Sequence, residues 1–163
     1  MCKIINKLIK LGCLFSAMLA VSGFAVAETG TGYMFNVSEN ITTSADGTII
    51  NESTSKGVWV VENQPAGFPS VMQGNCSATW VMAADFSNKG SSWRCVTTDT
   101  EGDGFLNVGS IMAPDWSDCA ASIVSSWGKY AGWQSSVNCQ PMGPFAGEDT
   151  STYMWSGEWT APE

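Results

Sequence analysis

The most chemically suggestive part of the sequence is an acidic segment, Asp99-Thr100-Glu101-Gly102-Asp103-Gly104. It places the carboxylates of Asp99, Glu101 and Asp103 at alternate positions, ahead of a glycine that permits a sharp turn. Hard cations such as Ca²⁺ prefer oxygen ligands spaced in this way around a curled loop. The twelfth position is Ser110 instead of the bidentate glutamate of an EF-hand, so a Ca²⁺ site here would be weak. A solvated β-turn is the alternative, and we favour it.

A second segment of interest is Gly128-Lys129-Tyr130-Ala131-Gly132, whose glycines are typical of a tight turn that leads into a strand. As a functional group, Lys129 would bind an anion. However, Tyr130 stands where a phosphate-binding loop has Ser or Thr, so the pattern does not indicate a nucleotide site. We interpret Lys129 as a turn lysine beside an aromatic strand.

The chain contains 8 tryptophans, and their flat apolar faces and polar N–H groups suit an apolar pocket or a sugar-binding platform. Near the C-terminus, Trp155 and Trp159 share one face of an expected strand, as do Tyr153 and Trp155. Our candidate ligand-binding residues are Trp133, Tyr153, Trp155 and Trp159. For most of the tryptophans the alternative is a role in the core or at the rim of a barrel.

The composition excludes several classes of function. The chain has no histidine, which removes Ser-His-Asp and Cys-His catalytic sites and histidine-ligated metals. We identify no catalytic residue and, apart from Ca²⁺, no cofactor. The net charge of −8 argues against nucleic-acid binding.

The N-terminal segment 1–27 has the pattern of a secretory signal peptide. Lys3, Lys7 and Lys10 precede an uncharged stretch that ends in Ala25-Val26-Ala27, a small-x-small site that predicts cleavage after Ala27. Cleavage would remove these three lysines and no acidic residue, so the mature chain 28–163 is still more acidic. It would have no membrane anchor and would be exported to the periplasm or outside the cell. Residues 28–32 are expected to form a flexible leader, followed by one domain over residues 33–163.

Four cysteines remain after this cleavage: Cys76, Cys95, Cys119 and Cys139. An even number in an exported chain predicts two disulfides. Three connectivities are open, and we favour Cys76–Cys95 with Cys119–Cys139, because each spacing suits adjacent strands of a meander. A redox or zinc site is disfavoured, since the sequence has no C-x-x-C pair.

The rest of the sequence predicts an all-β fold. Short apolar or β-branched runs alternate with Gly, Ser, Asn and Asp clusters. The expected strands are Tyr33–Ser38, Thr48–Ser53, Gly57–Glu62, Cys76–Met82, Ser92–Thr97, Phe105–Met112, Ser122–Trp127, Tyr130–Ser136 and Thr150–Trp159. The segment Asp115–Ala121 is open to a helical turn. We expect one small antiparallel β-barrel of about eight strands, with a β-sandwich as the alternative.

Arg94-Cys95, the acidic segment 99–103 and Trp127-Gly128-Lys129-Tyr130-Ala131-Gly132-Trp133 together resemble a layout of small exported bacterial proteins. Those proteins in turn resemble β-barrels of the allene oxide cyclase and dirigent type. The resemblance covers the second half of the mature chain, and the sequence departs from it by placing Ser126-Trp127 before Gly128. It implies a barrel that shapes an apolar cavity, and it assigns no catalytic residue.

Three hypotheses about function follow. The first, which we favour, is a non-enzymatic barrel that binds a small apolar or aromatic molecule or a glycan. The second is a small cyclase- or isomerase-like enzyme that uses the barrel cavity, and the third is a structural or interaction protein of the cell envelope.

Overall fold

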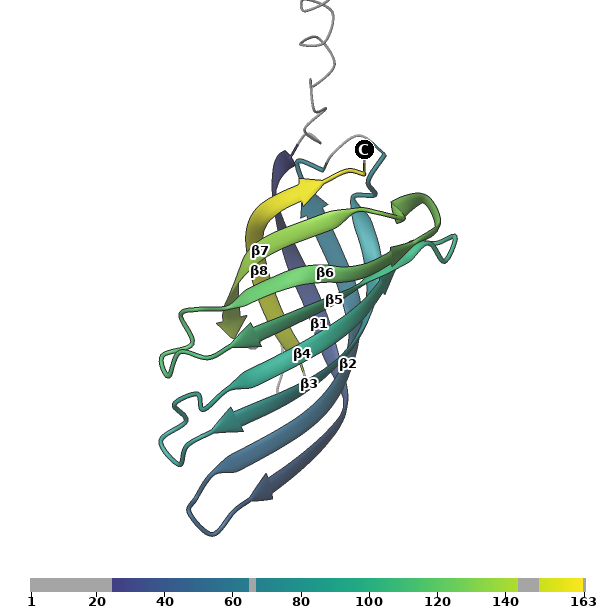
Figure 1. Cartoon of the computed structure of the whole chain (residues 1–163). Coiled ribbons are helices and arrows are strands. Elements are labelled where there is room, and N and C mark those ends of the chain that lie inside the picture. Colours follow the sequence, from purple (N-terminus) through teal and green to yellow (C-terminus); the bar gives the residue numbers. More distant parts are fainter. Residues whose placement is uncertain (1–24, 65–66, 144–149, 163) are drawn as a thin grey trace, which may run out of the picture.

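The computed structural model describes residues 25–64, 67–143 and 150–162, and it forms a closed eight-stranded antiparallel β-barrel (Figure 1). Each strand pairs with the next along the chain, and β8 returns to pair with β1. The strands are β1 (Ala25–Thr43), β2 (Ile49–Glu62), β3 (Val71–Met82), β4 (Ser91–Thr98), β5 (Gly104–Ile111), β6 (Ala120–Trp127), β7 (Gln134–Gly143) and β8 (Thr150–Thr160). The predicted barrel is therefore confirmed, and the sandwich alternative is wrong.

Alternating side chains explain why these segments form a barrel wall. In β4, Ser91, Cys95 and Thr97 are buried, whereas Arg94 and Val96 between them are exposed. A strand with this period of two presents one face to the interior and the other to solvent. β1 has 19 residues and its partner β2 has 14, so both are longer than β3 to β6. Together they form a ribbon that extends beyond these four strands at one end of the barrel (Figure 1).

Several predicted boundaries are wrong. The expected strands Thr48–Ser53 and Gly57–Glu62 are one continuous strand, β2, since Gly57 stays paired within the sheet. The expected strand Tyr130–Ser136 instead begins with the 3₁₀ turn η1 (Gly128–Tyr130), and β7 starts only at Gln134.

The segment Asp115–Ala121 is not helical. Oδ1 of Asp115 accepts hydrogen bonds from the backbone N–H of Ser117 at 3.2 Å and from its hydroxyl at 2.6 Å. Such a side-chain hydrogen bond offers the backbone a turn in place of a helix. Ala120 and Ala121 already belong to β6.

The predicted signal peptide lies outside the described residues except for 25–27, and those three residues begin β1. Residues 28–32, expected to be a flexible leader, also belong to β1, so that part of the prediction is wrong. Gly30 and Gly32 in this segment are buried positions paired with Trp155 of β8 and Trp59 of β2.

Glycine–tryptophan pairs of this kind recur around the barrel. Gly109 in β5 pairs with Trp93 in β4, just as Gly30 pairs with Trp155 and Gly32 with Trp59. A Cβ atom on Gly109 would lie 2.0 Å from Cζ2 of Trp93, and one on Gly30 would lie 2.1 Å from Cζ2 of Trp155. The indole rings thus lie flat over strand positions that carry no side chain, which allows several tryptophans to fit inside a small barrel.

Both predicted disulfides are present, Cys76–Cys95 and Cys119–Cys139. The first joins two residues directly opposite each other on β3 and β4, and the second joins the residue before β6 to β7. Two such bonds are typical of proteins that mature in an oxidising environment outside the cytosol. In the described part of the chain, no helix has the length and apolar character needed to span a membrane.

One end of the barrel, which we call the plugged end, is closed by residues 67–70, the segment just before β3. Phe68 from this segment is 5% exposed. Its ring lies 4.3 Å from Trp159, 5.4 Å from Tyr130 and 5.6 Å from Trp133, measured between centroids. These packed rings form the apolar core of the protein at this end.

Candidate functional site

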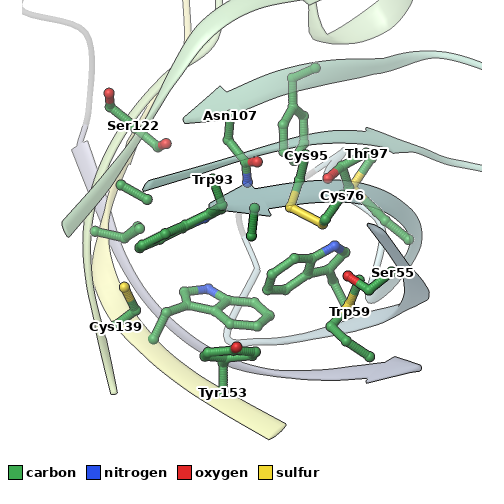
Figure 2. Close-up of a pocket in the computed structure, with 18 of the residues that line it drawn as sticks. Ser55, Trp59, Cys76, Trp93, Cys95, Thr97, Asn107, Ser122, Cys139 and Tyr153 are labelled. Carbon is green, nitrogen blue, oxygen red and sulfur yellow. A yellow bond between two sulfur atoms is a disulfide. The ribbon is translucent and has the colours of Figure 1, made fainter. Parts of the chain in front are cut away.

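The barrel encloses a cavity of about 170 Å³ beside the aromatic core. Aromatic side chains from five strands line it: Trp59 from β2, Trp80 from β3, Trp93 from β4, Phe105 from β5, and Tyr153, Trp155 and Trp159 from β8. Figure 2 shows Trp59, Trp93 and Tyr153 projecting into it from three different strands. The cavity also reaches Glu39, whose side chain is exposed, so it opens to solvent at the end opposite the plug. We call this the open end.

Three of the four aromatic residues proposed from the sequence lie around this cavity. Tyr153, Trp155 and Trp159 line it, as their shared strand face suggested. Trp133 is not among its lining residues, and it packs against the core cluster around Phe68 at the plugged end. The period of two grouped the β8 residues on one face, but it does not relate them to Trp133, which belongs to a different segment of the chain.

Trp59, Trp80 and Trp93 also line the cavity and were not among the site residues predicted from the sequence. Trp59 and Trp155 meet edge to face with centroids 5.0 Å apart, and Trp80 and Trp93 stack at 6.3 Å. All four line the cavity, although β2, β3 and β4 are distant from β8 in the sequence. Glycines stand opposite Trp59, Trp93 and Trp155 in the neighbouring strands, but these pairs can be recognised only once the strand register is known.

Apolar and aromatic side chains make up most of the cavity wall, with Ser, Thr and Asn side chains between them. Within the described residues, Nε1 of Trp59, Oγ1 of Thr97 and Oδ1 of Asn107 are buried without a hydrogen-bond partner. Nε1 of Trp80 donates to Oγ of Ser53 at 3.2 Å. A mostly apolar wall with a few unpaired polar atoms is typical of a site for a small ligand.

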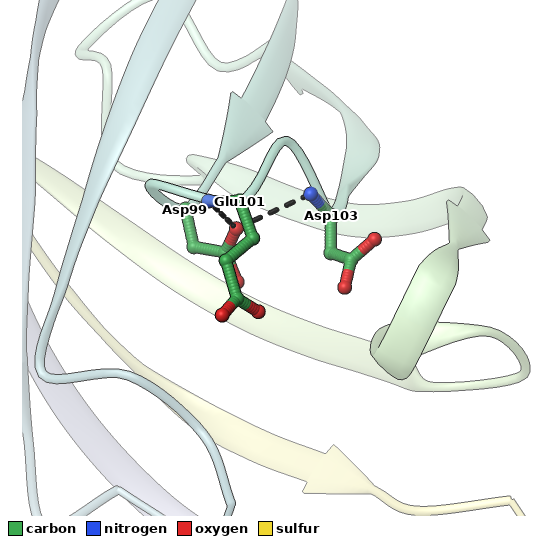
Figure 3. A group of neighbouring side chains, drawn as sticks. All are labelled: Asp99, Glu101 and Asp103. Atoms are coloured by element: carbon green, nitrogen blue, oxygen red, sulfur yellow. Dashed lines mark hydrogen bonds between the residues drawn. The ribbon is translucent and has the colours of Figure 1, made fainter.

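The acidic segment forms the turn between β4 and β5 at the plugged end (Figure 3). The structure brings Asp99, Glu101 and Asp103 together, with one oxygen of each within 4.8 Å of the others. Oδ1 of Asp99 accepts hydrogen bonds from the backbone N–H groups of Glu101 at 2.8 Å and Asp103 at 3.2 Å. These bonds within the loop close a tight β-turn.

Lys129 and Tyr130 of η1 dock onto this turn. Nζ of Lys129 lies 2.7 Å from Oδ2 of Asp99 and 2.8 Å from Oε2 of Glu101. The hydroxyl of Tyr130 donates to Oδ2 of Asp99 at 2.9 Å. Gly128 has φ of 62°, and a Cβ there would lie against the carboxylate of Asp103. The two motifs identified separately in the sequence are therefore partners in one contact.

This contact shifts three pKa values. Burial alone would raise the pKa of Asp99, but the hydrogen bonds from Lys129, Tyr130 and the Glu101 N–H outweigh it and lower the pKa to about 2. Hydrogen bonds to Asp99 and Glu101 raise the pKa of Lys129 above its usual value. Burial, followed by the hydrogen bond to Asp99, raises the pKa of Tyr130.

The ammonium group of Lys129 thus occupies the position between Asp99 and Glu101 that a bound cation would share. A protein cation already neutralises part of the cluster, and both oxygens of Asp99 are engaged. This geometry supports the β-turn interpretation of the segment over the Ca²⁺ interpretation. The ion pairs also account for Lys129 without an external anion.

Comparison with family models, with curated proteins and with solved structures gives no match to this chain. The resemblance to barrels of the allene oxide cyclase type therefore stays a prediction. Function has to be inferred from the cavity itself.

Proposed function

We propose that this protein is an exported binding protein that takes a small apolar or aromatic molecule into the open end of its barrel. The observation that carries the proposal is the aromatic cavity of about 170 Å³, plugged at one end and open at the other. An apolar cavity of about 150 Å³ is large enough to bind benzene. Export is supported by the signal-like N-terminus and by the two disulfides.

The position of the aromatic rings favours a small enclosed molecule over a surface glycan. Tyr153, Trp155 and Trp159 line the interior, so their faces do not form a flat platform on the outside of the barrel. A sugar platform requires rings that lie open to solvent, whereas a buried ring contributes most to an enclosed apolar ligand.

Filling the cavity tests the proposal. Ala78 lines it, and Thr79, the next residue along β3, belongs to the opposite face of the strand. We expect Ala78→Leu to weaken binding of toluene and p-cresol at least about tenfold, because the added side chain competes for the same space. Thr79→Leu adds similar bulk outside and should leave binding unchanged.

Binding is measured by isothermal titration calorimetry on the oxidised protein, with far-UV circular dichroism to verify the fold of each variant. If toluene, p-cresol and aliphatic alcohols of similar size all fail to bind the unmodified protein, the proposed function is wrong. Equal weakening by the two variants would show that the ligands bind elsewhere.

A further inference from the structure

Glu39 is the only charged side chain among the described residues that line the cavity. A β-bulge at Val37 shifts the register between Asn36 and Ser38, so that Asn36 and Glu39 both face inward although they are three positions apart. Without the bulge, the period of two would place Glu39 on the outer face. The bulge therefore directs a carboxylate into the barrel.

This carboxylate has no positive partner among the described residues. Nδ2 of Asn51 donates to Oε1 of Glu39 at 2.9 Å and holds the side chain at the open end. No ion pair to Glu39 is formed by the residues that the structure describes, and no described Lys or Arg lines the cavity. From the described residues, a molecule in the cavity thus encounters one negative charge and no positive charge.

The aromatic rings also favour a positively charged ligand. Trp59, Trp80, Trp93, Trp155 and Tyr153 all line the cavity. The face of an aromatic ring carries partial negative charge and attracts cations, most strongly in tryptophan. Several rings around one space, with a carboxylate at its opening, form the type of cage that binds alkylated ammonium groups.

We infer that the ligand of this cavity is a small organic cation with an alkylated ammonium group, held by the aromatic faces and by the Glu39 carboxylate. This inference rests on the proposed function and specifies the ligand class. It also agrees with the acidic character of the whole chain, whose net charge of −8 attracts cations from solution.

The direct test compares choline with 3,3-dimethyl-1-butanol, which has the same shape but a carbon atom in place of the charged nitrogen. We expect choline to bind the oxidised protein about tenfold more tightly than the neutral alcohol in calorimetric titrations. The preference should decrease at high salt, since the carboxylate lies at an opening to solvent.

Two matched variants distinguish the effect of the Glu39 carboxylate on choline binding from the effect of the protein's net charge. Glu39→Gln should weaken choline binding by about threefold to tenfold and leave binding of the neutral alcohol unchanged. Glu52→Gln is the control, because Glu52 lies on the same ribbon, paired with Asn40, and is exposed on the outer face. It removes the same charge from the protein and should change neither affinity.

A second measurement tests the rings without changing their shape. Biosynthetic replacement of tryptophan by fluorinated tryptophan reduces the negative charge on the ring faces. Choline affinity should decrease as the number of fluorine atoms per ring increases, whereas affinity for the neutral alcohol should not decrease in parallel.

The outcomes are distinguishable. Equal affinities for the two probes, or an effect of Glu52→Gln as large as that of Glu39→Gln, would overturn the cation inference and leave the proposed function in place. Failure of toluene, p-cresol and the neutral alcohols to bind would overturn the proposed function, and failure of choline as well would overturn both.

Discussion

The glycine–tryptophan pairs make a strong prediction about stability, best tested at Gly109. Alanine at this position would place a Cβ atom 2.0 Å from Cζ2 and 2.3 Å from Cε2 of Trp93, well inside van der Waals contact. Gly109 lies within the extended strand β5, so alanine adds no left-handed backbone strain and the clash can be measured by itself. The indole has to shift, and it is confined by stacking on Trp80.

Overpacking of this kind costs about 1–3 kcal/mol, and the severe overlap places Gly109→Ala near the upper limit. For a domain of this size, such a loss corresponds to a decrease in Tm of roughly 10 °C. The assay is urea unfolding of the oxidised protein, followed by far-UV circular dichroism so that changes in tryptophan fluorescence do not interfere. The control Ser110→Ala, at the next and exposed position, should change the free energy of unfolding by less than about 0.5 kcal/mol.

A double-mutant cycle identifies the cause. Trp93→Leu removes the ring that overlaps the new methyl group. In the Trp93→Leu protein, Gly109→Ala should therefore lower the free energy of unfolding only slightly. The coupling energy between the two sites should be about 2 kcal/mol. If Gly109→Ala is equally destabilising with Trp93 and with Leu at position 93, the proposed role of the glycine is refuted.

Three further predictions concern the turns at the two ends of the barrel. The pKa of Asp99 is about 2 in the folded protein against an ordinary value of 3.8. Ionised Asp99 therefore adds about 1 kcal/mol to the free energy of unfolding, after allowance for the half-exposed Lys129. This stabilisation is present above about pH 4 and is lost as the pH falls toward 2. Lys129→Met should make acid unfolding begin at higher pH. Millimolar Ca²⁺ should leave the Tm unchanged, since Lys129 already lies between Asp99 and Glu101; a rise that Asp99→Asn abolishes would restore the metal interpretation. Phe86 has φ of 64° and is 66% exposed, so Phe86→Gly should relieve strain and raise the free energy of unfolding by up to about 1 kcal/mol, whereas a comparable decrease would contradict this.

The general architecture of the protein was predictable because it depends on local and periodic signals. Alternating residues around Trp93 and Cys95 indicate a strand wherever they occur. The even cysteine count, with similar spacings within the two pairs, suited pairing between adjacent strands. The wrong predictions concern residue types, such as glycine, that occur both in flexible segments and in packed strands. Gly30 and Gly32 lie in the segment predicted to be a flexible leader, but they are buried beneath Trp155 and Trp59.

The candidate site was only partly predictable. Tyr153, Trp155 and Trp159 share one strand, so their common face follows from sequence spacing alone. The opposing rings of Trp59, Trp80 and Trp93 come from other strands, and their meeting depends on how far each strand is shifted against its neighbour. That shift is a property of the closed barrel.

An acidic all-β chain with two disulfides, an acidic turn and many tryptophans could be predicted from the residues alone, because these properties depend on composition, periodicity and spacing. The folded barrel was needed to show that Lys129 neutralises part of the acidic turn, and that the bulge at Val37 directs Glu39 into the barrel. A single-residue bulge reverses the face of every position after it, and a salt bridge between groups as distant in sequence as Asp99 and Lys129 depends on how the chain closes. Neither the Lys129 ion pair nor the inward position of Glu39 can be predicted until the register of the barrel is known.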